Sequence, residues 1–77
     1  AQVSVYPNPT TSYVIVTTGN LKTSQYEIVN LNGQLIYSET GVKNGDFQVS
    51  MENYPAGIYF LRVMTDKGML VKKISKM

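Results

Sequence analysis

The stretch YPAGIYFLRVM, residues 54–64, decides the fold of this chain. It is the longest apolar run, and its side chains alternate, so that Tyr59, Leu61 and Val63 share one face of an extended strand. The residues between them are also apolar, with the exception of Arg62. A strand that is apolar on both faces is typical of a central position in a sheet, covered on one side and partly covered on the other.

The approach to this strand resembles the tyrosine corner of immunoglobulin-like sandwiches, in which a tyrosine opens a strand two residues before a core position. Gly57, Tyr59 and Leu61 stand in that order here, and Leu61 takes the place that antibody domains give to a cysteine. We expect the ring of Tyr59, and likewise the rings of Tyr26 and Tyr13, to pack in the core with each hydroxyl reaching a loop carbonyl.

Six other segments have the composition of strands and are bounded by turn residues. Residues 30–33 (Asn-Leu-Asn-Gly) and 65–68 (Thr-Asp-Lys-Gly) predict hairpin turns, and residues 41–45 predict a loop. The last segment loses its alternation at Lys72 and Lys73, which predicts either a β-bulge or an edge position guarded by lysines. The sequence therefore predicts an all-β fold, an immunoglobulin-like antiparallel β-sandwich of about seven short strands in a single domain, residues 1–77. The predicted strands are residues 3–6, 13–18, 25–30, 34–39, 46–51, 58–64 and 69–76.

The composition excludes several classes of function. The chain has no cysteine and no histidine, so its hydroxyl groups have no imidazole base and zinc has none of its preferred ligands. We therefore predict a protein that is not an enzyme and that uses no metal and no cofactor. No segment approaches the ~18 apolar residues of a membrane span. Because the chain begins at Ala1 without a signal peptide, we expect it to be a piece of a larger secreted protein.

Charge and aromatic residues leave two interpretations open. The net charge is only +2, but residues 67–77 contain Lys67, Lys72, Lys73 and Lys76 and no acid. These lysines fit either solubilising charges on an edge strand or a recognition surface, whereas a nucleic-acid binder would need a larger basic patch. The six tyrosines could stack on sugars, although core packing explains strand tyrosines equally well.

Three stretches taken together resemble the type A C-terminal sorting domain of the type IX secretion system. They are VYPNP at residues 5–9, LNGQLI at residues 31–36, and PAGIYFLRV at residues 55–63 followed by KKI at residues 72–74. The order and spacing match over essentially the whole chain. One departure is the stretch MEN at residues 51–53, where an aspartate-containing stretch is common.

The resemblance implies a targeting module at the C-terminus of a larger exported protein of Bacteroidetes-type bacteria. Such a cargo reaches the periplasm by an ordinary signal peptide and is then directed to the cell surface or the medium. The implied partners are the outer-membrane translocon, a shuttle protein and a sortase, which normally removes the domain. The characteristic family positions, none of them catalytic, fall on Pro7, Asn8, Pro9, Gly33, Gly57, Tyr59, Lys72, Lys73 and Lys76.

We hypothesise that the final hairpin, residues 57–77, presents the recognised surface, with its edge strand docking by β-augmentation and its lysines steering it toward acidic partners. The main alternative is a carbohydrate- or protein-binding sandwich attached to an exported enzyme. A structural spacer of the fibronectin type is a second alternative.

Overall fold

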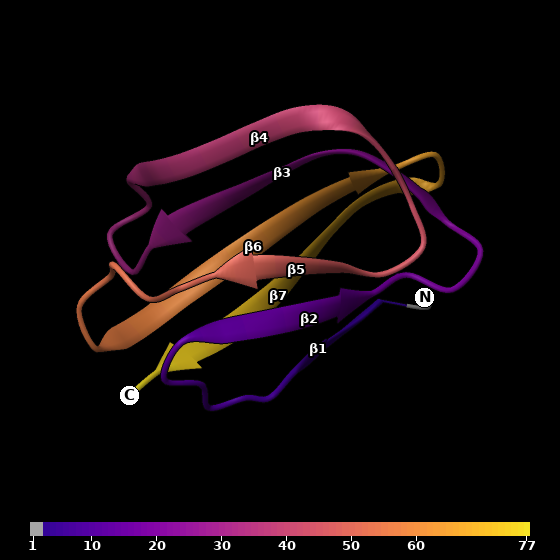
Figure 1. The fold of residues 1–77 in the computed structure, drawn as a ribbon. Helices are drawn as coiled ribbons and strands as arrows, with labels where there is room; N and C mark the ends of the chain where they lie inside the picture. The colour runs from indigo at the N-terminus through magenta and orange to yellow at the C-terminus, as the bar shows by residue number, and fades with distance from the viewer. Residues whose placement is uncertain (1–2) are drawn as a thin grey trace.

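The computed structural model describes residues 3–77 and contains seven strands and no helix in that range. The strands form two antiparallel sheets that pack face to face, one of three strands in the order β1-β2-β5 and one of four strands in the order β4-β3-β6-β7 (Figure 1). The predicted all-β sandwich of seven strands is therefore confirmed. The strands are β1 (Ser4–Tyr6), β2 (Tyr13–Thr17), β3 (Lys22–Asn30), β4 (Leu35–Asn44), β5 (Phe47–Ser50), β6 (Gly57–Thr65) and β7 (Gly68–Lys76).

The core lies between the sheets and is built from alternating strand positions. On β6, Tyr59, Leu61 and Val63 are buried, while the residues between them are half-buried. Strand β6 lies between β3 and β7, which confirms the central position that the apolar pattern predicts. The rest of the buried apolar cluster comes from both sheets: Val3, Val14, Val16, Tyr26, Ile28, Val49, Met51 and Ile74.

Tyr59 forms the predicted tyrosine corner. Its ring is buried, and its hydroxyl donates a hydrogen bond to the carbonyl of Pro55, four residues upstream. Tyr26 is also buried, but its hydroxyl donates to the Glu39 carboxylate and not to a loop carbonyl. Tyr13 is 42 % exposed, so its predicted core position is wrong. The reason is the alternation of β2, which places Val14 and Val16 on the inner face and Tyr13 on the outer face.

Strands β3 and β4 extend three or more residues beyond the ranges that the sequence predicts. Strand β3 begins at Lys22, and β4 continues to Asn44, where a loop was expected at residues 41–45. Apart from Val42, both extensions consist of polar or small residues, and they pair with each other as Lys22–Asn44 and Thr23–Lys43. Hydrogen bonding between β3 and β4 thus extends both strands through residues whose own β-strand propensity is mostly low.

The predicted hairpins are present. Gly33 has φ 84° and donates its N–H to the Asn30 carbonyl, which closes the β3–β4 turn in a conformation that favours glycine. The β6–β7 hairpin pairs Thr65 with Gly68 and continues without a register shift to Gly57 and Lys76. The β-bulge alternative at Lys72 and Lys73 is therefore wrong, and the edge alternative is confirmed, since β7 is an outer strand.

The chain enters and leaves the sandwich at opposite ends (Figure 1). Ser4 pairs with Thr17, close to the end where the N–H of Asp66 donates to the Lys22 carbonyl. Strand β7 runs away from that end and closes the chain beside residues 8–10. No helix among residues 3–77 is long and apolar enough to cross a membrane.

Replacing Tyr59 by Phe tests the tyrosine corner. We expect Tyr59→Phe to lower the free energy of unfolding by about 1–2 kcal/mol, because the Pro55 carbonyl loses its donor while the ring stays in the core. Urea unfolding followed by circular dichroism measures the change. Tyr6→Phe is the matched control, since Tyr6 is exposed, and it should be neutral within about 0.5 kcal/mol. Equal stability of both variants would contradict the assignment.

Candidate recognition surface

The Pro7-Asn8-Pro9 segment lies against the outer edge of β7, the last strand of the chain. The side-chain amide of Asn8 donates to the carbonyl of Lys73 (2.8 Å), and its oxygen accepts from the N–H of Ser75 (2.9 Å). The Asn8 side chain thus makes the two hydrogen bonds that the backbone of a neighbouring strand would make with β7. Residues more than 60 positions apart in sequence are joined by this contact.

Thr10 continues the same pairing with its backbone. Its N–H donates to the carbonyl of Ser75 (2.9 Å), and its carbonyl accepts from the N–H of Met77 (2.8 Å), in a parallel bridge with Lys76. We call the pairing of residues 8–10 with residues 73–77 the edge clamp. Thr10 is buried, but the sequence does not single it out, because a threonine after a proline turn carries no distinguishing signal.

The edge clamp occupies only part of the β7 edge. In an antiparallel pair alternate residues direct their backbone groups away from the partner strand, and on β7 these are the odd-numbered residues. The clamp uses the Lys73 carbonyl and both backbone groups of Ser75. Within the described residues, the backbone groups of Met69 and Val71 and the N–H of Lys73 form the remaining open edge.

The three predicted lysines have different environments. Lys72 is half-buried and lies opposite Leu61, so it belongs to the inner face of the sheet. Lys73 is exposed on the outer face, opposite Phe60. Lys76 is only 9 % exposed, and its ammonium donates to the carbonyl of Tyr54 (2.8 Å). Lys73 is therefore the member of the three whose side chain is most available to another molecule.

The other predicted positions shape the backbone at the same end of the sandwich. Gly57 has φ 154°, which side-chain-bearing residues rarely adopt, and it pairs with Lys76. Tyr59 holds Pro55 through the tyrosine corner. Gly33 is separated from the clamp, because its turn joins β3 and β4 on the far side of β6. We call residues 7–10, 53–59 and 73–77 together the motif end.

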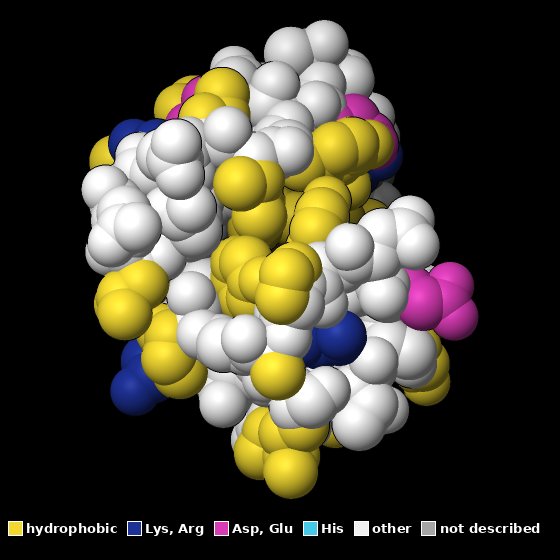
Figure 2. Space-filling view, turned by 90° about the vertical axis from the view of Figure 1, so that its left-hand side faces the viewer, with side chains coloured by type: hydrophobic (Ala, Val, Ile, Leu, Met, Phe, Trp, Pro, Cys, Tyr) yellow, Lys and Arg dark blue, Asp and Glu magenta, His cyan; other side chains and the backbone are white. Residues whose placement is uncertain are grey.

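Figure 2 views the side of the molecule that carries this end. Hydrophobic side chains gather in the middle of the face, and acidic side chains lie at its margins. Among residues 3–77 no group of three or more histidine, cysteine, aspartate or glutamate residues could hold a metal ion. The motif end offers backbone groups, apolar surface and lysine charge.

A second cluster of polar side chains lies on β3 and β4. The Glu39 carboxylate accepts from the hydroxyls of Tyr37 (2.8 Å) and Tyr26 (3.3 Å) and lies 2.7 Å from the Lys43 ammonium. The bond to Lys43, followed by that to Tyr37, lowers the pKa of Glu39 below its usual value. Burial is the main cause that raises the pKa of the Tyr26 hydroxyl, and the bond to Glu39 is the main cause for Tyr37.

The comparisons with known proteins decide the family. A family model described as "Secretion system C-terminal sorting domain" matches residues 4–77. The chain belongs to this family. A sorting domain of this kind is a C-terminal secretion signal of the type IX system and is not a catalytic domain. The chain is also 32 % identical over 63 residues to the Ulvan lyase NLR42 of Nonlabens ulvanivorans; the match covers 82 % of the chain and 12 % of that protein.

Removing the Asn8 amide tests the edge clamp. We expect Asn8→Ala to lower the free energy of unfolding by about 1–2 kcal/mol, because the Lys73 carbonyl and the Ser75 N–H lose their partner. Native-state hydrogen exchange at Ser75 should quicken as well. Asn32→Ala is the control, since Asn32 lies in the exposed β3–β4 turn. Unchanged exchange at Ser75 in Asn8→Ala would contradict the clamp.

Replacing Lys43 by Met tests the Glu39 cluster. The pKa of Glu39 should rise toward the ordinary glutamate value of about 4.3, because its largest stabilising bond is lost. A depressed folded pKa gives stability that is present above the unfolded pKa and is lost as the pH falls through the folded pKa. Carbon-13 NMR titration of the carboxyl measures the shift. Lys67→Met, at the β6–β7 turn, should leave it unchanged.

Proposed function

We propose that this secretion signal is read at the motif end, and that Lys73 and the adjoining edge of β7 are the part contacted by the type IX machinery. The cargo is an upstream domain of the same protein, which crosses the periplasm before outer-membrane export. The translocon and a shuttle protein bind the signal, and a sortase then cleaves the chain just before the sorting domain. The protein is released at the cell surface or into the medium.

The position of the motif end supports this assignment. Upstream sequence would enter at the start of β1, whereas β7 ends on the opposite side of the sandwich (Figure 1). The positions that the sequence resemblance singles out lie mostly at that second end, with the exception of Gly33. A signal that serves many cargos should be accessible whatever domain precedes it. A surface at the end remote from the cargo satisfies that requirement.

The edge clamp supports the proposal that the signal is a folded shape. Asn8 from the first motif and residues 73–77 from the last one form a single surface only when the sandwich has folded. Lys73 adds an exposed positive charge, which steers association with an acidic partner. The open N–H of Lys73 and the backbone groups of Val71, which adjoin the motif end, offer a short edge for β-augmentation.

Charge reversal of Lys73 tests the proposed surface. A signal peptide, a reporter and this chain are fused and expressed in a host with a working type IX system. We expect Lys73→Glu to lower reporter export about tenfold or more and to leave the reporter in the periplasm. The fold should be retained, because Lys73 is exposed and such substitutions change stability by about 0.5 kcal/mol or less.

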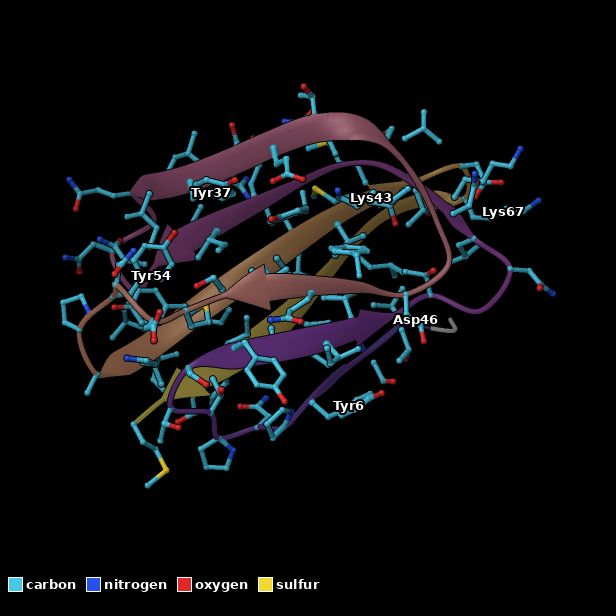
Figure 3. All side chains as sticks on the ribbon, in the orientation of Figure 1. Tyr6, Tyr37, Lys43, Asp46, Tyr54 and Lys67 are labelled. Carbon is cyan, nitrogen blue, oxygen red and sulfur yellow. The ribbon has the colours of Figure 1, made fainter. Side chains whose placement is uncertain are left out.

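Lys67→Glu is the matched control. Lys67 is also exposed, but it lies in the β6–β7 turn at the opposite end of the same hairpin (Figure 3). Its export should equal that of the unaltered fusion. Equal export of both variants would refute the surface and leave the sorting role intact, whereas failure of the unaltered fusion would refute the sorting role. Truncation of residues 72–77 is unsuitable, because it removes the buried Ile74 and Lys76.

A further inference from the structure

A hollow of about 320 Å³ opens between β4 and β5, on the opposite edge of the four-stranded sheet from β7. This volume is at the lower end of the roughly 300–1,000 Å³ of small-molecule sites. It accommodates a ligand the size of one ring. The residues that line it include Tyr26, Tyr37, Glu39, Gln48, Asn53 and Tyr54.

Aromatic rings form the walls of the hollow. Tyr37 is 40 % exposed and Tyr54 is half-buried, so both rings are accessible to a ligand. Figure 3 places them on the same side of the molecule, Tyr37 on β4 and Tyr54 in the connection below it. Tyr26 is held from behind by Phe47, with ring centroids 5.2 Å apart. The Tyr54 ring is supported by Tyr59 at 5.8 Å.

The hollow has no net charge, because its carboxylate is paired with a lysine. Glu39 is the charged residue of the lining, and Lys43 lies 2.7 Å from its carboxylate. Gln48 and Asn53 are neutral amides, and among residues 3–77 neither side chain has a hydrogen-bonding partner. An ionic ligand therefore gains little here, whereas a neutral ligand with several hydroxyl groups finds both donors and acceptors.

The side chains whose pKa values are shifted also line this hollow. The pKa of Glu39 is lowered by Lys43, and burial raises the pKa of Tyr54. Tyr26 and Tyr37, whose pKa values are also raised, line the same hollow. Perturbed groups that converge in a concave site are typical of functional sites.

We propose that this hollow binds one ring of a neutral saccharide. The C–H face of a pyranose packs against the exposed rings of Tyr37 and Tyr54, and its hydroxyls bond to Asn53, Gln48 and the Glu39 carboxylate. The site makes the sorting module also a weak glycan-binding module. It lies on the other edge of the four-stranded sheet from Lys73 and shares Asn53 and Tyr54 with the motif end.

The test is an NMR titration of the nitrogen-15-labelled chain with glucose, galactose, xylose and rhamnose, each up to about 100 mM, which suits a Kd in the millimolar range. We expect at least one sugar to shift the amides of Asn53, Tyr54 and Gln48. The amides of Thr23 and Asp66, beside a smaller hollow of about 150 Å³ at the other end, should not move. Absence of saturable shifts with all four sugars would overturn the proposal.

Tyr37→Ala removes an exposed wall of the hollow and should weaken binding roughly tenfold, whereas Tyr37→Phe should retain it. Tyr6→Ala is the matched control, because Tyr6 is an exposed tyrosine on the opposite side of the molecule (Figure 3). Equal loss of sugar binding in both alanine variants would overturn the site.

Choline and a proline-rich peptide are titrated in parallel. Larger shifts with either of them than with every sugar would reject the saccharide assignment.

Discussion

Two sheets packed face to face leave four strand edges open, and closing these edges is the constraint on which the rest of this structure depends. Strands β1 and β5 are only three and four residues long. Strand β4 is paired with β3 through two register shifts, which interrupt its regularity. The clamp of residues 8–10 closes the last part of the β7 edge, and Lys72 adds an inward-pointing charge. With no disulfide available, the clamp is what joins the first and last segments of the chain.

Much of the fold could be predicted from the sequence because the inner-face pattern is strong. Tyr59, Leu61 and Val63 specify the central strand, and the turn glycines at Gly33 and Gly68 fix both hairpins. The failures occur where pairing outweighs composition, as in the polar extensions of β3 and β4. The prediction also fails for Tyr13, because a shift of one residue along a strand moves a side chain from the inner to the outer face.

The candidate site was predicted as a set of positions but not as an arrangement. The roles of Asn8 and Lys76 depend on partners 65 and 22 residues away in sequence, and no local signal encodes such contacts. Three lysines that look equivalent in the sequence turn out to be an inner-face residue, an exposed charge and a buried donor. In this chain Asn8 and Lys76 build the motif end through their hydrogen bonds, whereas the Lys73 side chain is exposed on it.

The two proposed surfaces lie on opposite edges of the same sheet. Strand β4 carries Tyr37 at one edge, β7 carries Lys73 at the other, and β3 and β6 separate them. Tyr37 and Lys73 lie on strands that two others separate, so the effects of substituting these two residues should be independent. A ligand between β4 and β5 would leave Lys73 and the edge of β7 accessible, although it would contact Asn53 and Tyr54 of the motif end. A small sandwich can in this way carry a secretion signal on one sheet edge and a weak binding site on the other.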